Sequence, residues 1–538
     1  MWGVGRMSTA TAGLDPLAEA MAQAHSADAD RYTDPLSVPA LAWSLQHGDH
    51  AGRWLWHAGS LYRYSSGVYK RDGAEWAAAR LREILVAAAD RMTADAAERC
   101  AGAGQAWREA TEAMNLIHRI IGLPDSTLAA AEKKKLWPTP ETTRQAVEAR
   151  YTKPKLIDPT LLALTADVRL ATEGAAVDAD IDTLNLTNGL LDVRTMALRP
   201  HDPDHLSTIQ LPVAYDPDAN CPRFGRFLDE VLPPDAIPVV VEMLGYLLTA
   251  DTRQHKAFLL LGGGSNGKSV LLDVIRALLG AENCAATPLQ ALGEERFAPA
   301  TLVGKLANLC ADLPAATQKD TSTFKEVVAG DRLKAEEKFR PPFDFTPFAR
   351  LVFSANEAPG TTDASHGYWR RWVTIPFPAR YAEPDEVAAL AAGARVLDRG
   401  LTARLLAELP GILNLALVGL ARLRAQGGFT KAESCEMALQ QYRERADSVA
   451  GFVAESCDMT PGCTVGRTTL YVAYRDWCLQ SGREPLGRNR FCERIDATPG
   501  ITEERDDSRS RCWGGIRLRP HEVREVPGRA GRAGGWAQ

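Results

Sequence analysis

The chain has 538 residues, which exceeds one ordinary domain of about 150 residues and predicts several modules. Its 45% hydrophobic and 24% charged residues are globular averages, which excludes collagen-like, disulfide-scaffold and wholly disordered proteins. The formal charge of −6, from 62 basic and 68 acidic residues, gives no global sign of nucleic-acid binding, so any anion-binding surface must be local.

The cysteines and apolar runs limit the compartment. Ten cysteines are scattered along the chain without the C-x-x-C spacing of a zinc ribbon, so a reducing cytoplasm is expected. The longest apolar runs, such as Leu409–Ala421 and Ala236–Ala250, are too short for a bilayer span, so no membrane partner is expected. The start of the chain has no apolar h-region and does not read as a secretory signal.

The first part of the chain is expected to hold a leader and one domain. Residues 1–45 have little hydrophobic periodicity, which predicts a disordered leader. An α+β domain is expected over 46–225. It opens with short strands between Trp54 and Tyr69, where aromatic and small polar residues alternate. Apolar residues at helical spacing then predict helices at Glu75–Asp90 and Ala94–Ile121.

Two charged clusters and a turn follow in this domain. The run Lys133–Lys135 is interpreted as a solvated helix face, with phosphate contact as the alternative. Spaced carboxylates like those of a two-metal polymerase or primase site occur at Asp178, Asp180 and Asp182. No histidine or further carboxylate cluster surrounds them in the sequence, so a solvated turn is preferred. The pair Asn188-Gly189 predicts a turn within a β-rich connector at 180–217.

The most specific motif follows a helical pair at Pro222–Thr249 and the apolar run Ala257–Leu261, and it precedes an amphipathic helix that ends at Gly280. It fits G-x-x-x-x-G-K-[ST] in a strand–loop–helix context, which predicts a P-loop that binds ATP and Mg²⁺. Glycines let successive N–H groups point inward, Lys268 would reach the β and γ phosphates, and the Ser269 hydroxyl would bind magnesium. The expected nucleotide-binding residues are Gly262, Gly263, Gly264, Ser265, Asn266, Gly267, Lys268 and Ser269.

Two later apolar strands end in polar residues. Leu306–Ala311 ends in Asp312, the position of a Walker B carboxylate that orients magnesium or the attacking water, and an acidic turn is the alternative. Many such motifs carry a second acid where Ala311 stands, so the sequence leaves open whether Asp312 holds the metal, polarises water, or does both. Ala349–Ser354 leads to Asn356, which could hold the attacking water at the ligand-binding edge of an α/β sheet, with an ordinary turn as the alternative.

A hairpin is predicted between these two strands, at Lys334–Phe345. A basic residue beside an aromatic one suits phosphate contact and base stacking, and two prolines stiffen the tip. The predicted DNA-binding residues here are Lys338, Phe339 and Arg340, and a solvated hairpin without this role is the alternative.

An arginine pair, Arg370 and Arg371, lies in an aromatic-flanked loop before the apolar run Val373–Phe377. The pair is either stacked and paired with local carboxylates or an arginine finger that stabilises charge on a neighbouring subunit's nucleotide. The second interpretation makes the pair catalytic and requires a ring. The sequence does not choose between the two arginines.

The C-terminal part is locally basic. From Thr464 to Gln538, fourteen arginines stand against ten acids, the sign expected of a DNA-facing segment. Arg488, Arg490 and Arg494 lie on or beside a predicted helix at Asn489–Ile495 that suits the recognition helix of a winged helix, and the expected DNA contacts are Arg488 and Arg490. Exposed arginines with no nucleic-acid role are the alternative.

From Gly245 to Phe429 the chain resembles the superfamily 3 helicase core of phage and plasmid primase-helicases, the poxvirus-type family. The resemblance rests on GGGSNGKS, GKLANLCADLP, TFKEVVAGDRLKAEEKFRPPFDFTPFARLVFSANEAP and HGYWRRWVTIPF, in this order. Upstream, LNLTNGLLDVRTMALRPH resembles the domain that precedes the helicase in this family. Downstream, the segment that closes with RCWGGIRL resembles its C-terminal winged helix.

The resemblance implies an α/β fold with an AAA+ P-loop ATPase core at 226–430. A linker and winged-helix DNA-binding domain are expected at 431–519, and a disordered tail at 520–538. The family implies a hexameric ring around single-stranded DNA, with ATP hydrolysis at subunit interfaces and 3′ to 5′ translocation. By motif, Asp312 resembles the Walker B acid, Asn356 resembles sensor 1, and Lys338 lies on a DNA-contacting hairpin.

The expected function is therefore an ATP-hydrolysing helicase in phage, plasmid or mobile-element replication, in the cytoplasm of a bacterial host. Expected partners are single-stranded and duplex DNA, further copies of the chain, and a primase or other replication proteins. Primase chemistry itself is not expected, because the first 180 residues lack a zinc-binding cysteine set and a convincing carboxylate cluster. The alternative is an AAA+ initiator or loader that uses ATP as a switch and recruits another helicase or primase.

Overall fold

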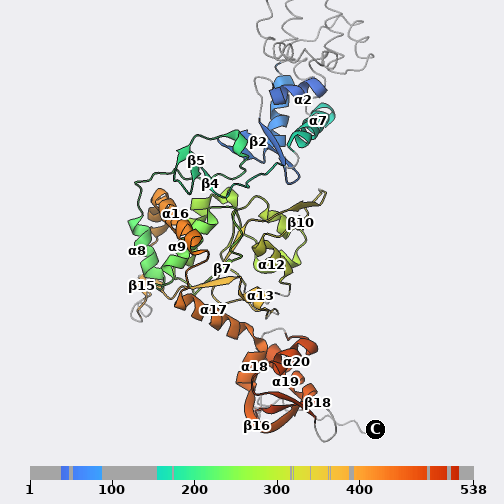
Figure 1. Cartoon of the computed structure of the whole chain (residues 1–538), viewed down its shortest axis with the longest axis vertical. Helices are drawn as coiled ribbons and strands as arrows, with labels where there is room; N and C mark the ends of the chain where they lie inside the picture. Colours follow the sequence, from blue (N-terminus) through green and yellow to red (C-terminus); the bar gives the residue numbers. More distant parts are fainter. Residues whose placement is uncertain are drawn as a thin grey trace, which may run out of the picture.

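The computed structural model describes residues 38–47, 53–85, 87, 154–172 and 175–519, with short gaps at 315–317, 319, 340, 362, 364, 384, 387–392, 482–484 and 506–510. Figure 1 shows the described parts as three units stacked along the long axis. The N-terminal unit is at the top, a large central unit follows, and the C-terminal unit is at the bottom. No helix within these described ranges is long and apolar enough to cross a membrane.

The N-terminal unit is a small antiparallel meander packed against helices. Its strands are β1 (Trp54–His57), β2 (Ser60–Ser65) and β3 (Val68–Lys70), which confirms the strands predicted between Trp54 and Tyr69. Residues 73–85 are helical, where a helix from Glu75 was predicted. The predicted helix Ala94–Ile121 and the run Lys133–Lys135 lie outside the described residues.

Two further helices complete this unit, α2 (Val38–His47) and α7 (Pro154–Thr172). The leader prediction for 1–45 is wrong where α2 begins, because Leu41 and Leu45 are buried in the same apolar cluster as Leu164 of α7. Residues 1–37 lie outside the described part of the chain.

A β-rich connector joins this unit to the central one. It contains β4 (Thr183–Leu186), β5 (Gly189–Asp192), β6 (Leu198–Arg199) and the 3₁₀ helix η2 (Pro203–His205). The β4–β5 turn is formed by Thr187 and Asn188, one residue before the predicted pair. Leucines of β4 and β5 are buried in the core of the central unit. The predicted boundary at 225 is therefore wrong, since the connector packs with the central unit and α8 (Pro222–Val231) crosses it.

The central unit is built on a five-stranded sheet whose described pairings are all parallel. Its order β13-β7-β12-β9-β8 is formed by Trp372–Pro376, Ala257–Leu261, Arg350–Ala355, Ala307–Cys310 and Cys284–Ala285. The central strands β7, β12 and β9 are almost fully buried because both faces of a parallel sheet are covered, whereas the edge strand β8 is partly exposed. Leu261 pairs with Ala355 and Cys310 with Phe353, so the carboxyl ends of three strands lie at one edge.

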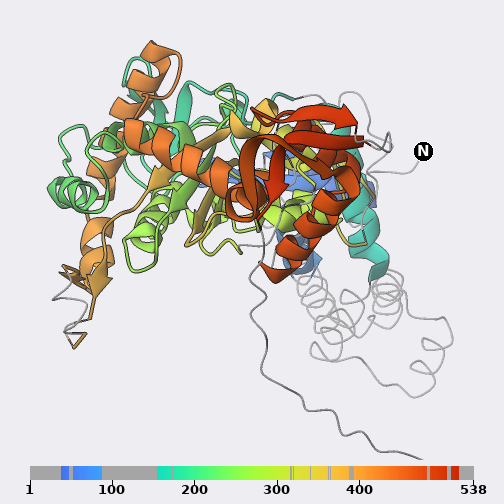
Figure 2. The same cartoon turned by 90° about the horizontal axis from the view of Figure 1, so that it is seen from below.

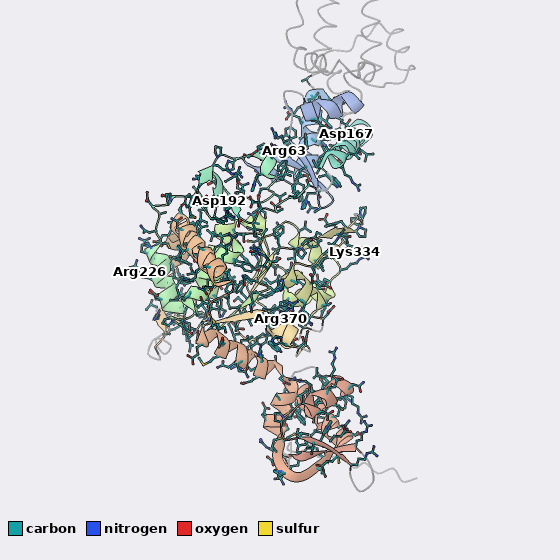
Figure 3. The ribbon with its side chains drawn as sticks, in the orientation of Figure 1. Arg63, Asp167, Asp192, Arg226, Lys334 and Arg370 are labelled. Carbon is teal, nitrogen blue, oxygen red and sulfur yellow. The ribbon has the colours of Figure 1, made fainter. Side chains whose placement is uncertain are left out.

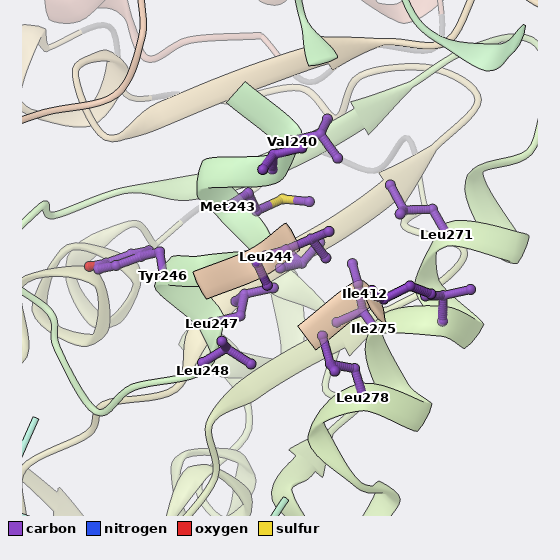
Figure 4. Close-up of a cluster of buried hydrophobic side chains, with 14 of the residues drawn as sticks. Val240, Met243, Leu244, Tyr246, Leu247, Leu248, Leu271, Ile275, Leu278 and Ile412 are labelled. Carbon is purple, nitrogen blue, oxygen red and sulfur yellow. The ribbon is translucent and has the colours of Figure 1, made fainter. Parts of the chain in front are cut away.

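Helices cover both faces of this sheet. On one face lie α8, α9 (Ile237–Leu247), α10 (Lys268–Leu279), α15 (Leu401–Leu406) and α16 (Leu409–Gln426). Figure 4 shows Leu244 of α9, Ile275 of α10 and Ile412 of α16 meeting in this core. On the other face lie α11 (Leu289–Glu294), α12 (Ser322–Ala329), α13 (His366–Trp369) and α17 (Glu433–Ala446). The remaining elements are η3 (Ala281–Asn283), η4 (Ala298–Leu302), β10 (Leu333–Ala335), β11 (Phe343–Phe345), β14 (Tyr381–Ala382) and β15 (Arg395–Val396).

The C-terminal unit has its own core. It contains α18 (Ser448–Ser456), β16 (Cys457–Gly466), α19 (Arg467–Gln480), α20 (Arg488–Asp496), β17 (Thr502–Arg505) and β18 (Arg511–Leu518), with sheet order β16-β18-β17. Buried Phe452, Tyr474, Phe491 and Trp513 fill its centre. Helix α20 confirms the helix predicted at Asn489–Ile495. Figure 2, seen from below, shows this unit following the α17 segment.

The expected linker at 431 is instead the packed helix α17. Its Tyr442 is fully buried, with its ring 5.0 Å from Trp369 and 6.2 Å from Trp372 of the central unit. A single aromatic residue in a charged helix gives a weak periodic signal, which explains why the sequence suggested a linker. The predicted tail from 520 lies outside the described residues.

Candidate nucleotide and nucleic-acid sites

The P-loop connects β7 to α10 at the carboxyl edge of the central sheet. Gly264 and Gly267 have φ values of 94° and 91°, which glycine adopts without the steric cost paid by other residues. The Gly264 N–H donates to the Gly262 carbonyl at 2.9 Å, and the Ser265 carbonyl accepts from the Tyr381 N–H at 2.7 Å. The loop is thus folded on itself and held from the segment that follows β13.

Lys268 is the buried cation of this loop. Lys268 is only 5% exposed, and its Nζ donates to the Gly262 carbonyl at 2.5 Å. Two amide oxygens also accept from it, Asn266 Oδ1 at 3.1 Å and Asn356 Oδ1 at 3.2 Å. Burial lowers the pKa of Lys268, and the nearby Asp312 carboxylate acts in the opposite direction.

The surroundings of Lys268 fit an anionic phosphate. Its three acceptors are neutral oxygens, and among the residues that the structure describes no carboxylate lies within ion-pair distance of Nζ. Burying a charge is costly unless it is paired, so an anion at this loop would remove an existing penalty. The N-terminal end of helix α10 adds positive potential at the loop. Its N-cap residue is Gly267, so no side chain caps this end of the helix.

Three predicted catalytic residues meet at this edge. Asn356 follows β12 and contacts Lys268, while Asp312 follows β9 and is exposed. Ser269 is exposed in the first turn of α10. A hydroxyl and a carboxylate are ligands that magnesium prefers, so Ser269 and Asp312 fit a magnesium ion beside a phosphate.

The arginine pair lies at the opposite edge of the sheet. Arg370 and Arg371 precede β13, whose first residue Trp372 pairs with Ala257 at the start of β7. The P-loop begins only after Leu261, at the other end of this five-residue strand. The two sites are thus separated by about 16 Å of strand, at about 3.3 Å per residue. Figure 3 shows Arg370 on the side of the central unit toward the C-terminal unit.

The two arginines differ in their surroundings. Arg371 donates to the Gly367 carbonyl, and its pKa is lowered by burial and by the neighbouring Arg370. Arg370 is exposed, and its carbonyl accepts from Nζ of Lys256 at 2.6 Å. The sequence reasoning missed Lys256, although it directly precedes β7 and so shares this edge by strand order.

The predicted hairpin is formed by β10 and β11. At its tip Phe339 is 93% exposed with φ 65°, and Lys338 Nζ lies 5.1 Å from its ring centroid. This exposed aromatic beside a cation fits the predicted contact with a nucleic-acid base and phosphate. Arg340 lies outside the described residues.

The arginines predicted in the C-terminal unit are exposed on α20. Arg488 donates to Thr468 Oγ1 at 2.9 Å, and the apolar side of the helix buries Phe491 and Ile495. Arg490 lines a cavity of about 970 Å³ between the C-terminal and central units. Their role in DNA binding stays a prediction.

The three carboxylates of the connector string make separate contacts. The Asp178 carboxylate accepts from the Thr208 N–H at 2.8 Å, so the interpretation as a solvated turn is wrong for this residue. Asp180 accepts from the Asp182 N–H, and Asp182 pairs with Arg424 at 2.8 Å. Within the described residues no group of three or more acidic, histidine or cysteine side chains is arranged to hold a metal.

Another network missed by the sequence reasoning lies between α12 and α13. The Asp363 carboxylate pairs with Lys325 and accepts from Thr321 Oγ1 at 2.5 Å and from the Ser365 N–H at 2.9 Å. Ser365 in turn caps α13, which directly precedes Arg370. Thr321 lies 42 residues before Asp363, and Lys325 is similarly distant, so only the folded chain brings these two side chains to the carboxylate.

Comparison with known proteins gives two family matches. Residues 41–233 match the family described as D5 N terminal like. Residues 260–371, which include the whole P-loop, Asp312, Asn356 and Arg370, match a family of unknown function, DUF5906.

Two viral proteins are similar at low identity. The putative helicase L207/L206 of Acanthamoeba polyphaga mimivirus is 23% identical over 215 residues, which cover 38% of this chain and 22% of that protein. The putative helicase 121R of Invertebrate iridescent virus 3 is 22% identical over 361 residues, 61% of this chain and 38% of that protein. The chain thus spans less than two fifths of either relative.

A solved structure, the apo C-terminal region of NrS-1, covers 58% of this chain and 80% of its own, with 12% identity and a TM-score of 0.35. The D5 match and the viral relatives support a relationship to D5-type primase-helicases. Both viral relatives carry the name putative helicase.

Proposed function

We propose that this chain is an ATP-dependent DNA helicase of superfamily 3 that acts in the replication of phage, plasmid or other mobile DNA. In this proposal it translocates on single-stranded DNA by hydrolysing ATP at subunit interfaces, in the cytoplasm of a bacterial host. The observation that carries the proposal is the meeting of Lys268, Asn356 and the Asp312 strand end at one edge of a parallel sheet. The D5 match and the helicase names of the viral relatives support it.

An AAA+ core is supported by the strand order. The P-loop strand β7 is separated from the Asp312 strand β9 by β12, so Asn356 stands between the phosphate loop and the Walker B position. A winged helix is supported by the C-terminal unit, where three helices pack on a three-stranded antiparallel sheet. Both assignments belong to the proposal.

The residues of the P-loop edge have separate tasks in this proposal. Lys268 binds the β and γ phosphates, and its three neutral acceptors keep the ammonium in position. Ser269 and Asp312 would hold magnesium, which supplies charge neutralisation on the phosphates when bound. Asn356, next to the Lys268 ammonium, orients the attacking water with its amide group, because an amide both donates and accepts hydrogen bonds.

The arginine pair supports an oligomer. An arginine about 16 Å of strand away from its own P-loop is too distant to reach that nucleotide, so in this proposal it acts on the nucleotide of a neighbouring subunit. Arg370 is the better candidate for this finger, because it is exposed while Arg371 is tied to the Gly367 carbonyl. A ring, most simply a hexamer by the family resemblance, would supply such a neighbour at every site.

DNA contact is assigned to two regions. The hairpin tip offers Lys338 to a phosphate and the exposed Phe339 to a base. Helix α20 offers Arg488 and Arg490 to duplex DNA. A primase or another replication protein is a further expected partner, and primer synthesis by this chain is not part of the proposal.

The first test is hydrolysis of ATP with and without single-stranded DNA, with mass measured in parallel. We expect DNA-stimulated hydrolysis by a particle of about six chains, lost in Lys268→Ala and retained in the control Lys431→Ala, which removes an exposed lysine. ATP binding with negligible, DNA-insensitive turnover on a monomer or dimer would contradict the motor and favour the initiator or loader. Strand displacement by the purified chain then separates a helicase from a translocase without unwinding activity.

The arginine finger has a test of its own. Lys268→Ala and Arg370→Ala are each expected to be inactive, but a mixture of the two should recover part of the activity. Recovery is expected because some mixed interfaces combine an intact Lys268 with an intact Arg370 from the other subunit. Absence of recovery in particles shown to contain both variants would refute a finger that acts between subunits.

A further inference from the structure

The hairpin tip carries two carboxylates, and an arginine from another element holds each one. Arg296 donates to Glu336. Arg71, which directly follows β3 of the N-terminal unit, pairs with Glu337 at 2.6 Å. Glu337 is the residue next to Lys338, so the Arg71 contact ends within one residue of the proposed DNA-binding group.

The N-terminal meander supports this contact in two ways. Ser60 of β2 accepts from Arg71 Nε at 3.0 Å, which orients the guanidinium toward the hairpin. The β1–β2 turn also approaches the hairpin, because a Cβ added to Gly59 would lie 3.8 Å from the Phe343 ring of β11. Figure 1 shows the meander and the β10 hairpin approaching each other across the boundary between the two units.

The hairpin needs outside support to keep one position. Its two strands have three residues each, and a short two-stranded hairpin is marginally stable by itself. Its tip projects Phe339 into solvent, and a cavity of about 1130 Å³ lies beneath, lined by Arg71, Glu337 and Lys338. The Arg71–Glu337 pair crosses from one unit to the other at the rim of this cavity, with side chains 42% and 22% exposed.

We infer that Arg71 is a positioning residue for the DNA hairpin: through Glu337 it holds Lys338 and Phe339 where they meet single-stranded DNA. This inference rests on the proposed function, in which the hairpin contacts DNA. Through Arg71 the N-terminal unit then contributes to DNA binding, although this unit does not itself contact the DNA. Movement of the hairpin during hydrolysis then either carries the meander along or breaks this pair.

Glu337→Gln separates positioning from simple electrostatics. The substitution removes a negative charge next to Lys338, so electrostatics alone predicts tighter binding of the DNA polyanion. Loss of positioning predicts weaker binding, because the hairpin tip then samples more conformations that must be lost on binding. The two explanations thus give opposite signs for one substitution.

The experiment measures the affinity of the full chain for fluorescent oligo-dT by anisotropy. We expect Glu337→Gln and Arg71→Ala each to weaken binding by about threefold, the scale of a half-exposed ion pair. The double variant Arg71→Glu/Glu337→Arg should return to within about twofold of wild type, because the pair is restored in reverse. The control Asp204→Asn also removes one negative charge and an ion pair, the more exposed Arg53–Asp204 pair at 2.7 Å, and should leave affinity unchanged.

Tighter or unchanged binding by Glu337→Gln would overturn the inference, and so would failure of the double variant to recover. Lys338→Ala separates this result from a failure of the proposed function. If Lys338→Ala weakens DNA binding while Glu337→Gln does not, only the positioning role is wrong. If Lys338→Ala leaves DNA binding unchanged, the DNA contact proposed for the hairpin is wrong, and the positioning role of Arg71 is wrong with it.

Discussion

Gly263 and Gly264 are neighbours in the P-loop, and both occupy variable positions of the G-x-x-x-x-G-K-[ST] pattern. The pattern therefore predicts that alanine is tolerated equally at the two positions. The structure distinguishes them. A Cβ at Gly263 would meet nothing within 4 Å, and its φ is not positive, whereas Gly264 has φ 94°.

The cost of Gly264→Ala follows from its backbone alone, because the nearest atom to its added Cβ would be Asn356 Oδ1 at 3.9 Å. Holding alanine on the left-handed side costs about 1–2 kcal/mol. If the loop relaxes without nucleotide and returns to this conformation on binding, the Kd for ATP rises by about 5- to 30-fold. If the loop cannot relax, the same energy appears as lower stability.

Calorimetric titration with ATP and chemical denaturation, applied to both variants, check this expectation. For Gly264→Ala, the loss of ATP-binding free energy and the loss of unfolding free energy should together equal the cost of holding alanine at positive φ. Gly263→Ala should match wild type in both assays. Equal behaviour of the two variants would refute the argument from φ.

Three further predictions follow from the C-terminal core, the α12–α13 network and the metal ligands. Trp513→Ala should destabilise the C-terminal unit by about 3–5 kcal/mol in calorimetry, since Trp513 is fully buried and donates to Asp496, and an unchanged C-terminal transition would contradict this. Burial alone would raise the pKa of Asp363, but hydrogen bonds from Lys325, Thr321 and Ser365 outweigh burial and hold this pKa below its usual value. The ionised Asp363 carboxylate therefore stabilises the folded state above about pH 4, and this stabilisation is lost as pH falls. Wild type should therefore lose more stability than Asp363→Asn between about pH 5 and pH 3 in urea titrations, and equal slopes would refute the assignment. Chelation of magnesium with EDTA should stop hydrolysis, and turnover that persists would contradict the role given to Ser269 and Asp312.

The parts of the fold that sequence predicted are local ones. Strand β7, the P-loop and α10 follow from an apolar run, a glycine-rich loop and a helical pattern within 24 consecutive residues. Strands β9 and β12 are short apolar runs with polar ends, and each was predicted to within two residues. Secondary structure of this kind depends on neighbouring residues, so a single sequence carries it.

What the sequence did not predict depends on distant packing. Helix α2 was taken for part of a disordered leader, since its burial depends on α7, more than a hundred residues away. The Arg71–Glu337 pair joins residues that are 266 positions apart, and although Glu337 lies in the predicted hairpin, nothing in the sequence indicates Arg71 as its partner. The convergence of Asn356 on Lys268 was expected from strand ends, but the order of the strands, which makes them neighbours, came only from the fold.

The strand order also decides how the two halves of the proposed catalytic site are divided. Because all described pairings of the central sheet are parallel, every loop after a strand lies at one edge and every loop before a strand lies at the other. Lys268, Asp312 and Asn356 belong to the first kind, and Arg370 to the second. A chain with this arrangement cannot complete its own site by a small local movement, since a sheet strand of fixed length separates the parts. If Arg370 takes part in hydrolysis, assembly is therefore a condition of catalysis rather than a modifier of it, and the activity per chain should rise steeply with protein concentration until rings are complete.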